Sequence, residues 1–385
     1  MPLPFPDLRS RLNRVIGIPS VSATNPELDM SNRPIIEQLA DYFETLGFSN
    51  EIIPCHSPGK FNLIATLGNG PGGLVLAGHT DTVPYDEERW SSDPFRLRED
   101  SGKLMGLGIT DMKGFFPIVM EAVRELDGAS LKEPLIVLAT AEEETSMEGA
   151  RVIAEMGRPL ARAALIGEPT GLKPVQTHKG ILMDAIRLTG QSGHSSDPSL
   201  GRNALDGMHE IISALIQYRR QLKDKYHNPL FEIPYPTLNL GSIHGGDNPN
   251  RICGHCELQF DVRLMPGMNL DSVRHDIEQQ VKAVAQPRGL NFEMVQLFTG
   301  VPAFFANENS ELLKVVEELS GHSGLNVAYG TEAPFLQKLG MDTIVMGPGH
   351  IEQAHQPDEY MSLDMLKPAI KLIRELIIRQ CINHR

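Results

Sequence analysis

The chain has 385 residues, too many for one ordinary domain of about 100–200 residues, and 41% of them are hydrophobic, enough for a large core. Its 35 basic and 49 acidic residues give a formal net charge of −14, which would repel nucleic acid and anionic membrane surfaces. The first residues lack the basic and apolar regions of a signal peptide, and no apolar run approaches the roughly 20 residues of a membrane helix. The overall composition is that of an ordinary globular protein, so it also excludes disordered, collagenous and coiled-coil chains. We expect a cytoplasmic protein of at least two domains, with neither nucleic acid nor membrane as a partner.

The four cysteines are too few for a disulfide framework in a chain of this length, and they suit a reducing compartment. Cys253 and Cys256 form a single CxxC motif within a strand-like stretch. A zinc ribbon needs a second ligand pair, and a thioredoxin-type motif opens a helix. We interpret these two cysteines as strand residues without a chemical role.

Helix-like and strand-like patterns alternate from the N-terminus to about residue 179. Apolar residues recur at helical spacing over 7–16 and 33–46. Short apolar runs that predict buried strands cover 61–67, 74–78, 135–140 and 163–167. This alternation predicts an α/β domain with a mostly parallel sheet and helices on both faces.

The pattern changes after residue 179. Strands are predicted at 181–189, 237–243, 253–263 and 291–298, and helices at 203–222 and 270–284. Their β-α-β-β-α-β order is that of a ferredoxin-like α+β unit. From about residue 299 the α/β style returns, with a helix at 310–320, a strand at 343–346 and a helix at 364–378. We therefore expect one domain made of 1–179 and 299–385, interrupted by an inserted domain of 180–298.

Polar residues with metal-ligand chemistry follow several of the predicted strands. His79 and Asp81 lie two residues apart at the end of one strand and would share a face. A carboxylate beside an imidazole can accept one ring N–H and leave the other nitrogen free for a metal. Asp111 precedes an apolar helix, and its alternative role is that of a helix N-cap.

Further acids and a second histidine follow the other strands. Glu142, Glu143 and Glu144 come after strand 135–140, and three adjacent carboxylates repel one another unless a cation is present. Glu168 ends the strand at 163–167, and the last strand is followed by His355, whose rival on the same loop is His350. Because strand ends converge at one edge of a sheet, these side chains predict a nitrogen and oxygen site that suits zinc, with cobalt or manganese as possible substitutes. Two metals that share a water are compatible with this set.

These segments resemble the di-zinc amidohydrolases, a family that includes carboxypeptidase G-type enzymes, aminoacylases, succinyl-diaminopimelate desuccinylase and acetylornithine deacetylase. The resemblance spans nearly the whole chain and rests on residues 78–81, 108–114, 143–144, 167–170 and 354–355. Within the family the sequence is most similar to the acetylornithine deacetylase branch, through residues 144–147, 250–253, 330–335 and 355–360.

The resemblance implies a site with two zinc ions and five ligands. Asp111 would bridge the ions, and the remaining ligands would be His79 and Glu168 on one ion and Glu144 and His355 on the other. It also implies a cis peptide between Asp111 and Met112.

Two further residues of this domain receive catalytic roles from the resemblance. Asp81 would orient His79, and Glu143 would be the general base. The family usually has Asp where Glu142 stands, and the downstream residues 145–147 favour Glu143 and Glu144 for the two functional positions.

The inserted domain corresponds to the lid or dimerisation domain of the family, which implies a homodimer. His194 would enter the partner's active site and stabilise the tetrahedral oxyanion. Asn250 and Arg263 resemble substrate-carboxylate binders, and an arginine fork suits a carboxylate. We hypothesise that Glu332, in a glycine-containing loop, faces the side-chain ammonium of the substrate.

The expected function is hydrolysis of N-acetyl-L-ornithine to L-ornithine and acetate, in arginine biosynthesis, by a metal-bridged water. Two alternatives stay open. The chain could be another N-acyl amino acid hydrolase, such as an aminoacylase, carboxypeptidase or desuccinylase. It could also be a non-catalytic amino-acid or metal binding protein, although such a protein would not need a base like Glu143 beside the metals.

Overall fold

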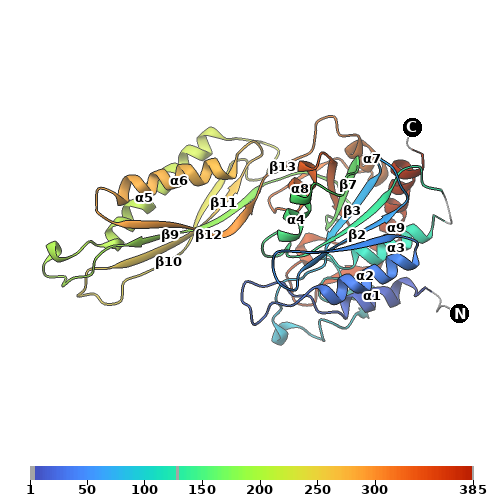
Figure 1. The fold of residues 1–385 in the computed structure, drawn as a ribbon, viewed down its shortest axis with the longest axis horizontal. Helices are drawn as coiled ribbons and strands as arrows, with labels where there is room; N and C mark the ends of the chain where they lie inside the picture. The colour runs from blue at the N-terminus through green and yellow to red at the C-terminus, as the bar shows by residue number, and fades with distance from the viewer. Residues whose placement is uncertain (1–4, 127–129, 384–385) are drawn as a thin grey trace. The chain divides into compact units, whose positions relative to one another are not determined.

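The computed structural model describes residues 5–126 and 130–383, which divide into two compact units (Figure 1). The first unit comprises residues 1–176, 306–325 and 331–385, and the second comprises 177–305 and 326–330. The sequence placed the two transitions after residues 179 and 298 and did not indicate the return of 326–330 to the second unit.

The first unit is built on a mixed sheet whose central strands are parallel. Along the sheet the order is β1 (Ser49–Pro54), β2 (Phe61–Leu67), β6 (Leu135–Thr140), β3 (Leu74–His79), β7 (Ala163–Pro169), β15 (Asp342–Gly347) and β8 (Val175–His178). Strands β6, β3, β7 and β15 are parallel, and β1, β2 and β8 pair antiparallel at the two sides. The expected central parallel sheet is confirmed. The antiparallel outer strands were not predicted, because an apolar run gives no strand direction.

Strand β8 carries the chain out of the first unit. Val175 pairs with Val345 of β15, and further along the strand His178 pairs with Phe304 of β13 (Phe304–Phe305). The short β14 (Leu325–Val327) also pairs with β8.

Helices cover both faces of the central sheet (Figure 1). Helices α3 and α9 pack together on one side, and α4 and α8 pack together on the other. The helices of this unit are α1 (Leu8–Ile16), α2 (Arg33–Thr45), α3 (Phe115–Arg124), α4 (Glu148–Met156), α7 (Glu311–Ser320), α8 (Ala333–Lys338) and α9 (Leu363–Ile377). Eight of the ten residues of α3 are buried, as expected of a helix covered on most sides. Its N-cap is Gly114, so the alternative interpretation of Asp111 as the helix cap is wrong.

A small three-stranded sheet in the same unit joins distant segments. Its order is β16 (Tyr360–Ser362), β5 (Lys103–Met105) and β4 (Arg98–Asp100), and all its pairs are antiparallel. Tyr360 is opposite Met105, so the chain that follows β5 and the chain that precedes β16 emerge side by side.

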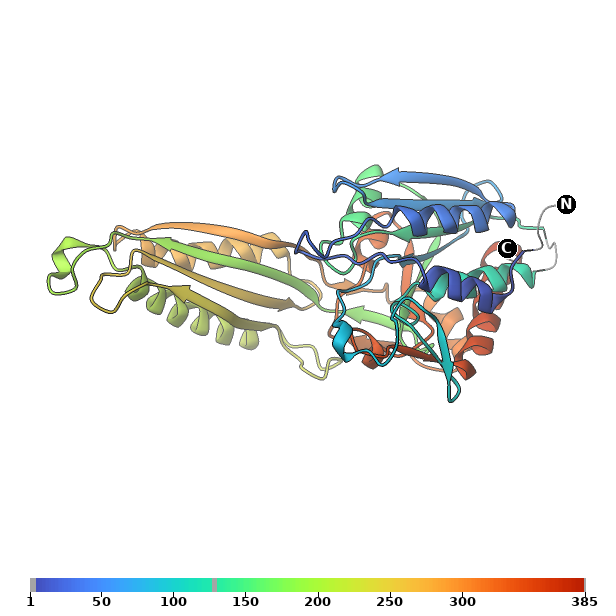
Figure 2. The same cartoon turned by 90° about the horizontal axis from the view of Figure 1, so that it is seen from below.

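The second unit has an antiparallel sheet with two helices on one face (Figure 2). The sheet order is β10 (Thr237–Gly245), β11 (His255–Leu264), β9 (Gly180–Thr189) and β12 (Asn291–Val301), and the helices are α5 (Ala204–Lys225) and α6 (Leu270–Ala285). Alternate residues of β11 are buried, because one face of the strand packs on the helices and the other does not. The β-α-β-β-α-β order of elements is the expected one.

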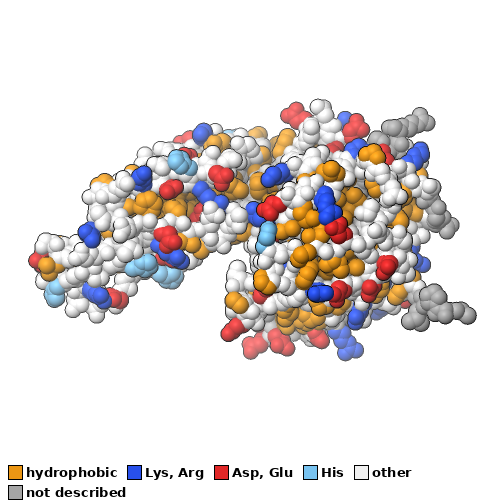
Figure 3. Space-filling view, in the orientation of Figure 1, with side chains coloured by type: hydrophobic (Ala, Val, Ile, Leu, Met, Phe, Trp, Pro, Cys, Tyr) orange, Lys and Arg blue, Asp and Glu red, His pale blue; other side chains and the backbone are white. Residues whose placement is uncertain are grey.

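Basic and acidic side chains are interspersed over the visible surface of each unit (Figure 3). Of the helices in the described part of the chain, none is both long enough and apolar enough to cross a membrane.

Candidate metal centre

The ends of the central strands bring the candidate ligands together in the first unit. His79 is the last residue of β3, Glu168 lies near the end of β7, and Glu143 and Glu144 follow β6. Ligand atoms of His79, Asp111 and Glu168 all lie within 4.8 Å of one another. The same holds for two further groups, Asp111 with Glu144 and His355, and His79 with Glu143 and Glu144.

Asp111 belongs to two of these groups because its two carboxylate oxygens face different histidines. Its Oδ1 lies 3.1 Å from Nε2 of His79, and its Oδ2 lies 3.4 Å from Nε2 of His355. Asp111 is thus placed as a bridging carboxylate would be. Its peptide bond to Met112 is cis, as the resemblance implied.

His79 is oriented by the main chain of Asp81. Nδ1 of His79 lies 3.0 Å from the Asp81 carbonyl oxygen, which can only accept, so Nδ1 carries a proton and Nε2, which faces Asp111, is the nitrogen that could bind a metal. The Asp81 carboxylate is 3.7 Å from that nitrogen and instead accepts the backbone N–H groups of Glu143 and Glu144, at 3.2 and 3.1 Å. Asp81 therefore contacts both the histidine and the glutamate turn.

The three consecutive glutamates separate into two environments. Oε1 of Glu142 lies 2.6 Å from Nζ of Lys60 and accepts a hydrogen bond of 2.6 Å from the Ser22 hydroxyl. Glu143 and Glu144, in contrast, belong to the groups of possible ligands. The geometry thus separates Glu142 from the other two, and the roles of Glu143 as base and Glu144 as ligand stay predictions.

The two histidines of the last loop, His350 and His355, also lie in different environments. Nε2 of His355 lies 3.0 Å from Oε2 of Glu144, and hydrogen bonds to Asp111 and Glu144 raise the pKa of His355 to about 10. His350 makes an isolated bridge to Thr170 and does not join a ligand group within the described residues.

The charge balance of the cluster fits a divalent cation. Burial, reinforced by neighbouring carboxylates, raises the pKa of Glu143 and Glu168 well above the ordinary glutamate value, and it also raises the pKa of Glu144. The Oε1 atom of Glu168 is buried without a hydrogen-bond partner. Repulsion among buried carboxylates and an unpartnered carboxylate oxygen are both relieved by a cation. Imidazole and carboxylate donors without thiolate suit zinc.

Glu332 lies beside β6. It is the N-cap residue of α8, it is 1% exposed, and its Oε1 accepts a hydrogen bond from the Thr140 hydroxyl. Its Oε2 is buried without a partner, and burial raises the pKa of Glu332 to about 7. The hypothesis that Glu332 contacts a substrate ammonium stays a prediction.

The three remaining candidates lie in the second unit. His194 is exposed, its Nδ1 is 2.7 Å from the Ser196 hydroxyl, and its backbone forms a bridge with Arg251. Asn250 is exposed next to this bridge, and Arg263, on β11, forms an ion pair of 3.2 Å with Asp261. The roles of these three residues toward a substrate stay predictions.

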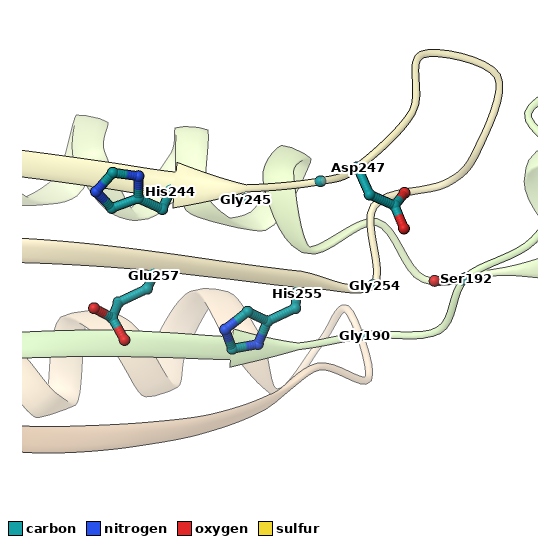
Figure 4. A pocket seen from close by; sticks show the side chains of 9 residues that line it. Gly190, Ser192, His244, Gly245, Asp247, Gly254, His255 and Glu257 are labelled. Atoms are coloured by element: carbon teal, nitrogen blue, oxygen red, sulfur yellow. The ribbon is translucent and has the colours of Figure 1, made fainter.

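The second unit also has a hollow of about 630 Å³ at the ends of its strands (Figure 4). Its lining includes His244, Asp247, His255 and Glu257, but no group of three metal-ligating atoms occurs there among the described residues. Cys253 and Cys256 are buried in the core of this unit. Cys256 lies on β11, as expected, but Cys253 precedes this strand, so its predicted place on a strand is wrong.

Comparison with known proteins identifies the family. The model of peptidase family M20/M25/M40 matches residues 75–379, which is most of the chain. The chain belongs to this family. The expected family and its hydrolase class are therefore confirmed.

Two relatives match this M20/M25/M40 chain over its full length. The acetylornithine deacetylase of Pectobacterium carotovorum subsp. carotovorum (strain PC1) is 48% identical over 384 residues, covering 99% of this chain and 100% of the relative. The acetylornithine deacetylase of Proteus mirabilis (strain HI4320) is 49% identical over 389 residues, covering 100% of both.

Solved structures share the fold. An M20 family metallo-carboxypeptidase, Sso-CP2 from Sulfolobus solfataricus, matches with a TM-score of 0.74 and 20% identity, over 97% of this chain and 98% of that one. Aminopeptidase PepT from Bacillus cereus matches with a TM-score of 0.73 and 18% identity, over 96% and 97%.

Sequence reasoning missed two residues that shape this centre, Lys60 and Glu359. Lys60 is a single lysine 82 positions before Glu142, and nothing in its local pattern indicates the pairing. Glu359 follows His355 by four positions and lies in the segment 355–360 that carries the resemblance, but no role was predicted for it.

Proposed function

We propose that this hydrolase removes the acetyl group of N-acetyl-L-ornithine, giving L-ornithine and acetate, and that it acts in arginine biosynthesis. The proposal is carried by the position of Asp111, whose two oxygens face His79 and His355 within two groups of possible metal ligands. The substrate is supported by the names of two full-length relatives at 48% and 49% identity.

The centre would hold two zinc ions, with cobalt or manganese as possible substitutes. Asp111 would be shared, and the other ligands would be His79 and Glu168 for one ion and Glu144 and His355 for the other. Such a pair of ions supplies Lewis-acid polarisation of the amide carbonyl and lowers the pKa of an attacking water.

Glu143 would be the general base. It lies among the candidate ligand residues, with a carboxylate oxygen within 4.8 Å of ligand atoms of His79 and Glu144. Glu143 would take the proton of the attacking water as the water oxygen bonds to the acetyl carbon. It would then give that proton to the nitrogen as the C–N bond breaks, which releases ornithine as an amine and acetate as the acid.

Three side chains would bind the two charged ends of the substrate. The guanidinium of Arg263 and the amide of Asn250 would bind the α-carboxylate, and Glu332 would face the side-chain ammonium, directly or through water. His194 would donate a hydrogen bond to the oxyanion from the partner subunit. The protein would then work as a cytoplasmic homodimer that pairs through the second unit.

An assay against acylated amino acids tests the substrate. Purified zinc-loaded protein is incubated with N-acetyl-L-ornithine, N-acetylmethionine, N-succinyl-diaminopimelate and a folate-type acyl glutamate, and kcat/KM is measured for each. The proposal expects the largest value for N-acetylornithine. A larger value for another compound would identify a different amidohydrolase, and no turnover of any would favour a binding protein.

A mixed dimer tests the action of His194 in the partner site. A His194→Ala subunit and a Glu143→Gln subunit are each expected to be almost inactive alone. After subunit exchange, the mixed dimer contains one site with both residues and should regain activity. No recovery, with exchange confirmed by mass spectrometry, would exclude action in trans.

A further inference from the structure

The small three-stranded sheet of β16, β5 and β4 holds Glu359 next to the loop of residues 108–111, which carries Asp111. Strand β16 begins at Tyr360 and pairs with β5, and the ladder continues with the Gly106 N–H donating to the Glu359 carbonyl at 3.0 Å. The Thr110 hydroxyl donates to the carbonyl of Tyr360 at 2.8 Å. The segments before Tyr360 and after Met105 are therefore fixed to each other.

The side chain of Glu359 then binds three backbone N–H groups of this loop. Its Oε2 accepts from Gly108 at 2.9 Å, and its Oε1 accepts from Thr110 at 2.7 Å and Asp111 at 3.0 Å. Glu359 is 1% exposed, so water does not compete for these bonds.

The loop is shaped so that its N–H groups converge on this carboxylate. Gly108 has a φ of +82°, and a Cβ there would lie 2.9 Å from a methyl carbon of Thr82. Only glycine combines this conformation with that space. The buried lysine nearby, Lys113, donates instead to the carbonyl of Ile18 at 2.8 Å, so backbone N–H groups are the partners of the Glu359 side chain.

We propose that Glu359 is a positioning residue for the bridging carboxylate of the metal centre. By holding the main chain of residues 108–111, it keeps Asp111 where its two oxygens face His79 and His355 together. Glu359 also follows His355 by four residues, so it links the segments that supply two of the ligands. This inference rests on the proposed metal centre.

Cobalt binding to Glu359→Gln tests this role. The variant has nearly the same size, but its amide replaces one acceptor oxygen with an N–H donor, which would face a backbone N–H group. Wild-type protein and the variant are stripped of metal and titrated with Co²⁺ against a chelator while the d–d absorption is recorded. Because groups that orient metal ligands change affinity by about 10–100-fold, we expect Co²⁺ binding at least about tenfold weaker and an altered spectrum. Glu352→Gln, at an exposed position on the same loop, is the matched control and should bind like wild type.

Two further variants separate positioning from general stability. In a Asp111→Asn background, Glu359→Gln should weaken Co²⁺ binding less than it does alone, because its effect acts through Asp111. If Glu359→Gln does not fold, Glu359→Asp provides the test, since its shorter side chain cannot reach all three N–H groups. Wild-type Co²⁺ affinity and spectrum in a folded Glu359 variant would overturn the proposal, even if that variant unfolds at a lower urea concentration. The Co²⁺ titration does not depend on which substrate the enzyme uses. The proposed substrate is tested separately, by the turnover of the wild-type enzyme.

Discussion

Lys60 and Glu142 form an ion pair beside the metal centre, with Nζ 2.6 Å from Oε1 and the two side chains only 3% and 11% exposed. Glu142 is the first of three adjacent glutamates, and its charge is balanced by Lys60. The other two, Glu143 and Glu144, belong to the groups of candidate metal ligands. Lys60 also contacts Asp29 at 2.7 Å, so one buried cation serves two carboxylates.

Lys60→Met should lower the stability of the protein strongly. Removing one partner of a buried pair leaves an uncompensated charge and costs about 3–5 kcal/mol. Urea unfolding monitored by circular dichroism measures this cost. Arg33→Met is the control, because its pair with Glu37 is exposed and an exposed pair contributes roughly 0–1 kcal/mol. Equal unfolding midpoints for the two variants would contradict the role of Lys60, whereas Glu142→Gln added to Lys60→Met should recover part of the loss.

Glu143→Gln should reduce turnover and leave the metal content nearly unchanged. Loss of acid–base catalysis lowers rates by about 10²–10⁴-fold or more. Glu144→Gln, in contrast, should lose metal, because it changes a proposed ligand. Metal analysis after gel filtration, together with kcat, compares the two variants. The opposite result, with metal lost from Glu143→Gln and kept by Glu144→Gln, would show that the two roles are exchanged.

The sequence predicted the ligand-bearing strands well because their signals are local. Strand β6 was predicted with its observed bounds from one uninterrupted apolar run, and the acids that follow it marked the edge of the sheet. Asp111 was recognised as a candidate although the helix after it starts only at Phe115.

Long-range partners were not predictable from one sequence. The pairing of Lys60 with Glu142 and the three hydrogen bonds of Glu359 depend on how distant segments pack. The main chain of Asp81 orients His79, whereas the motif suggested its carboxylate, because spacing does not distinguish a backbone acceptor from a side-chain acceptor. The direction of the outer strands likewise depends on packing that a local pattern does not encode.

Glu332→Gln should weaken kcat/KM for N-acetylornithine much more than for N-acetylmethionine, which has a similar length and no side-chain charge. A carboxylate that faces the ammonium in a desolvated site is worth more than the roughly 0–1 kcal/mol of an exposed pair. Steady-state kinetics with both substrates measures the difference. Equal losses would assign Glu332 to the support of β6 through Thr140, which its hydrogen bond already shows.

His178 should make the protein less stable in mild acid. Its ring is fully buried against Phe304, its Nδ1 lies 2.9 Å from the Lys179 carbonyl oxygen, and burial lowers its pKa to about 4. The unfolded chain has a histidine pKa of about 6.5, so between about pH 6.5 and about pH 4 the unfolded state binds a proton that the folded state does not. Stability contributed by the neutral ring is therefore complete above about pH 6.5 and falls as the pH is lowered, by about 3 kcal/mol in total.

The urea unfolding midpoint as a function of pH measures this contribution. His178→Gln should show a weaker loss of stability than wild type over the same window, because it removes the titrating group. His209→Gln, at an exposed position of α5, serves as the control. Parallel pH profiles for wild type and His178→Gln would contradict the assignment.

The dependence of N-acetylornithine hydrolysis on bound metal tests the central claim most directly. Protein stripped with a chelator is titrated with Zn²⁺, and ornithine release is followed together with bound zinc, with Asp111→Ala in parallel. The account predicts no turnover without metal, recovery as zinc fills the two proposed sites, and neither full zinc binding nor turnover in Asp111→Ala. Full turnover by the metal-free protein, or full zinc content and activity in Asp111→Ala, would contradict it.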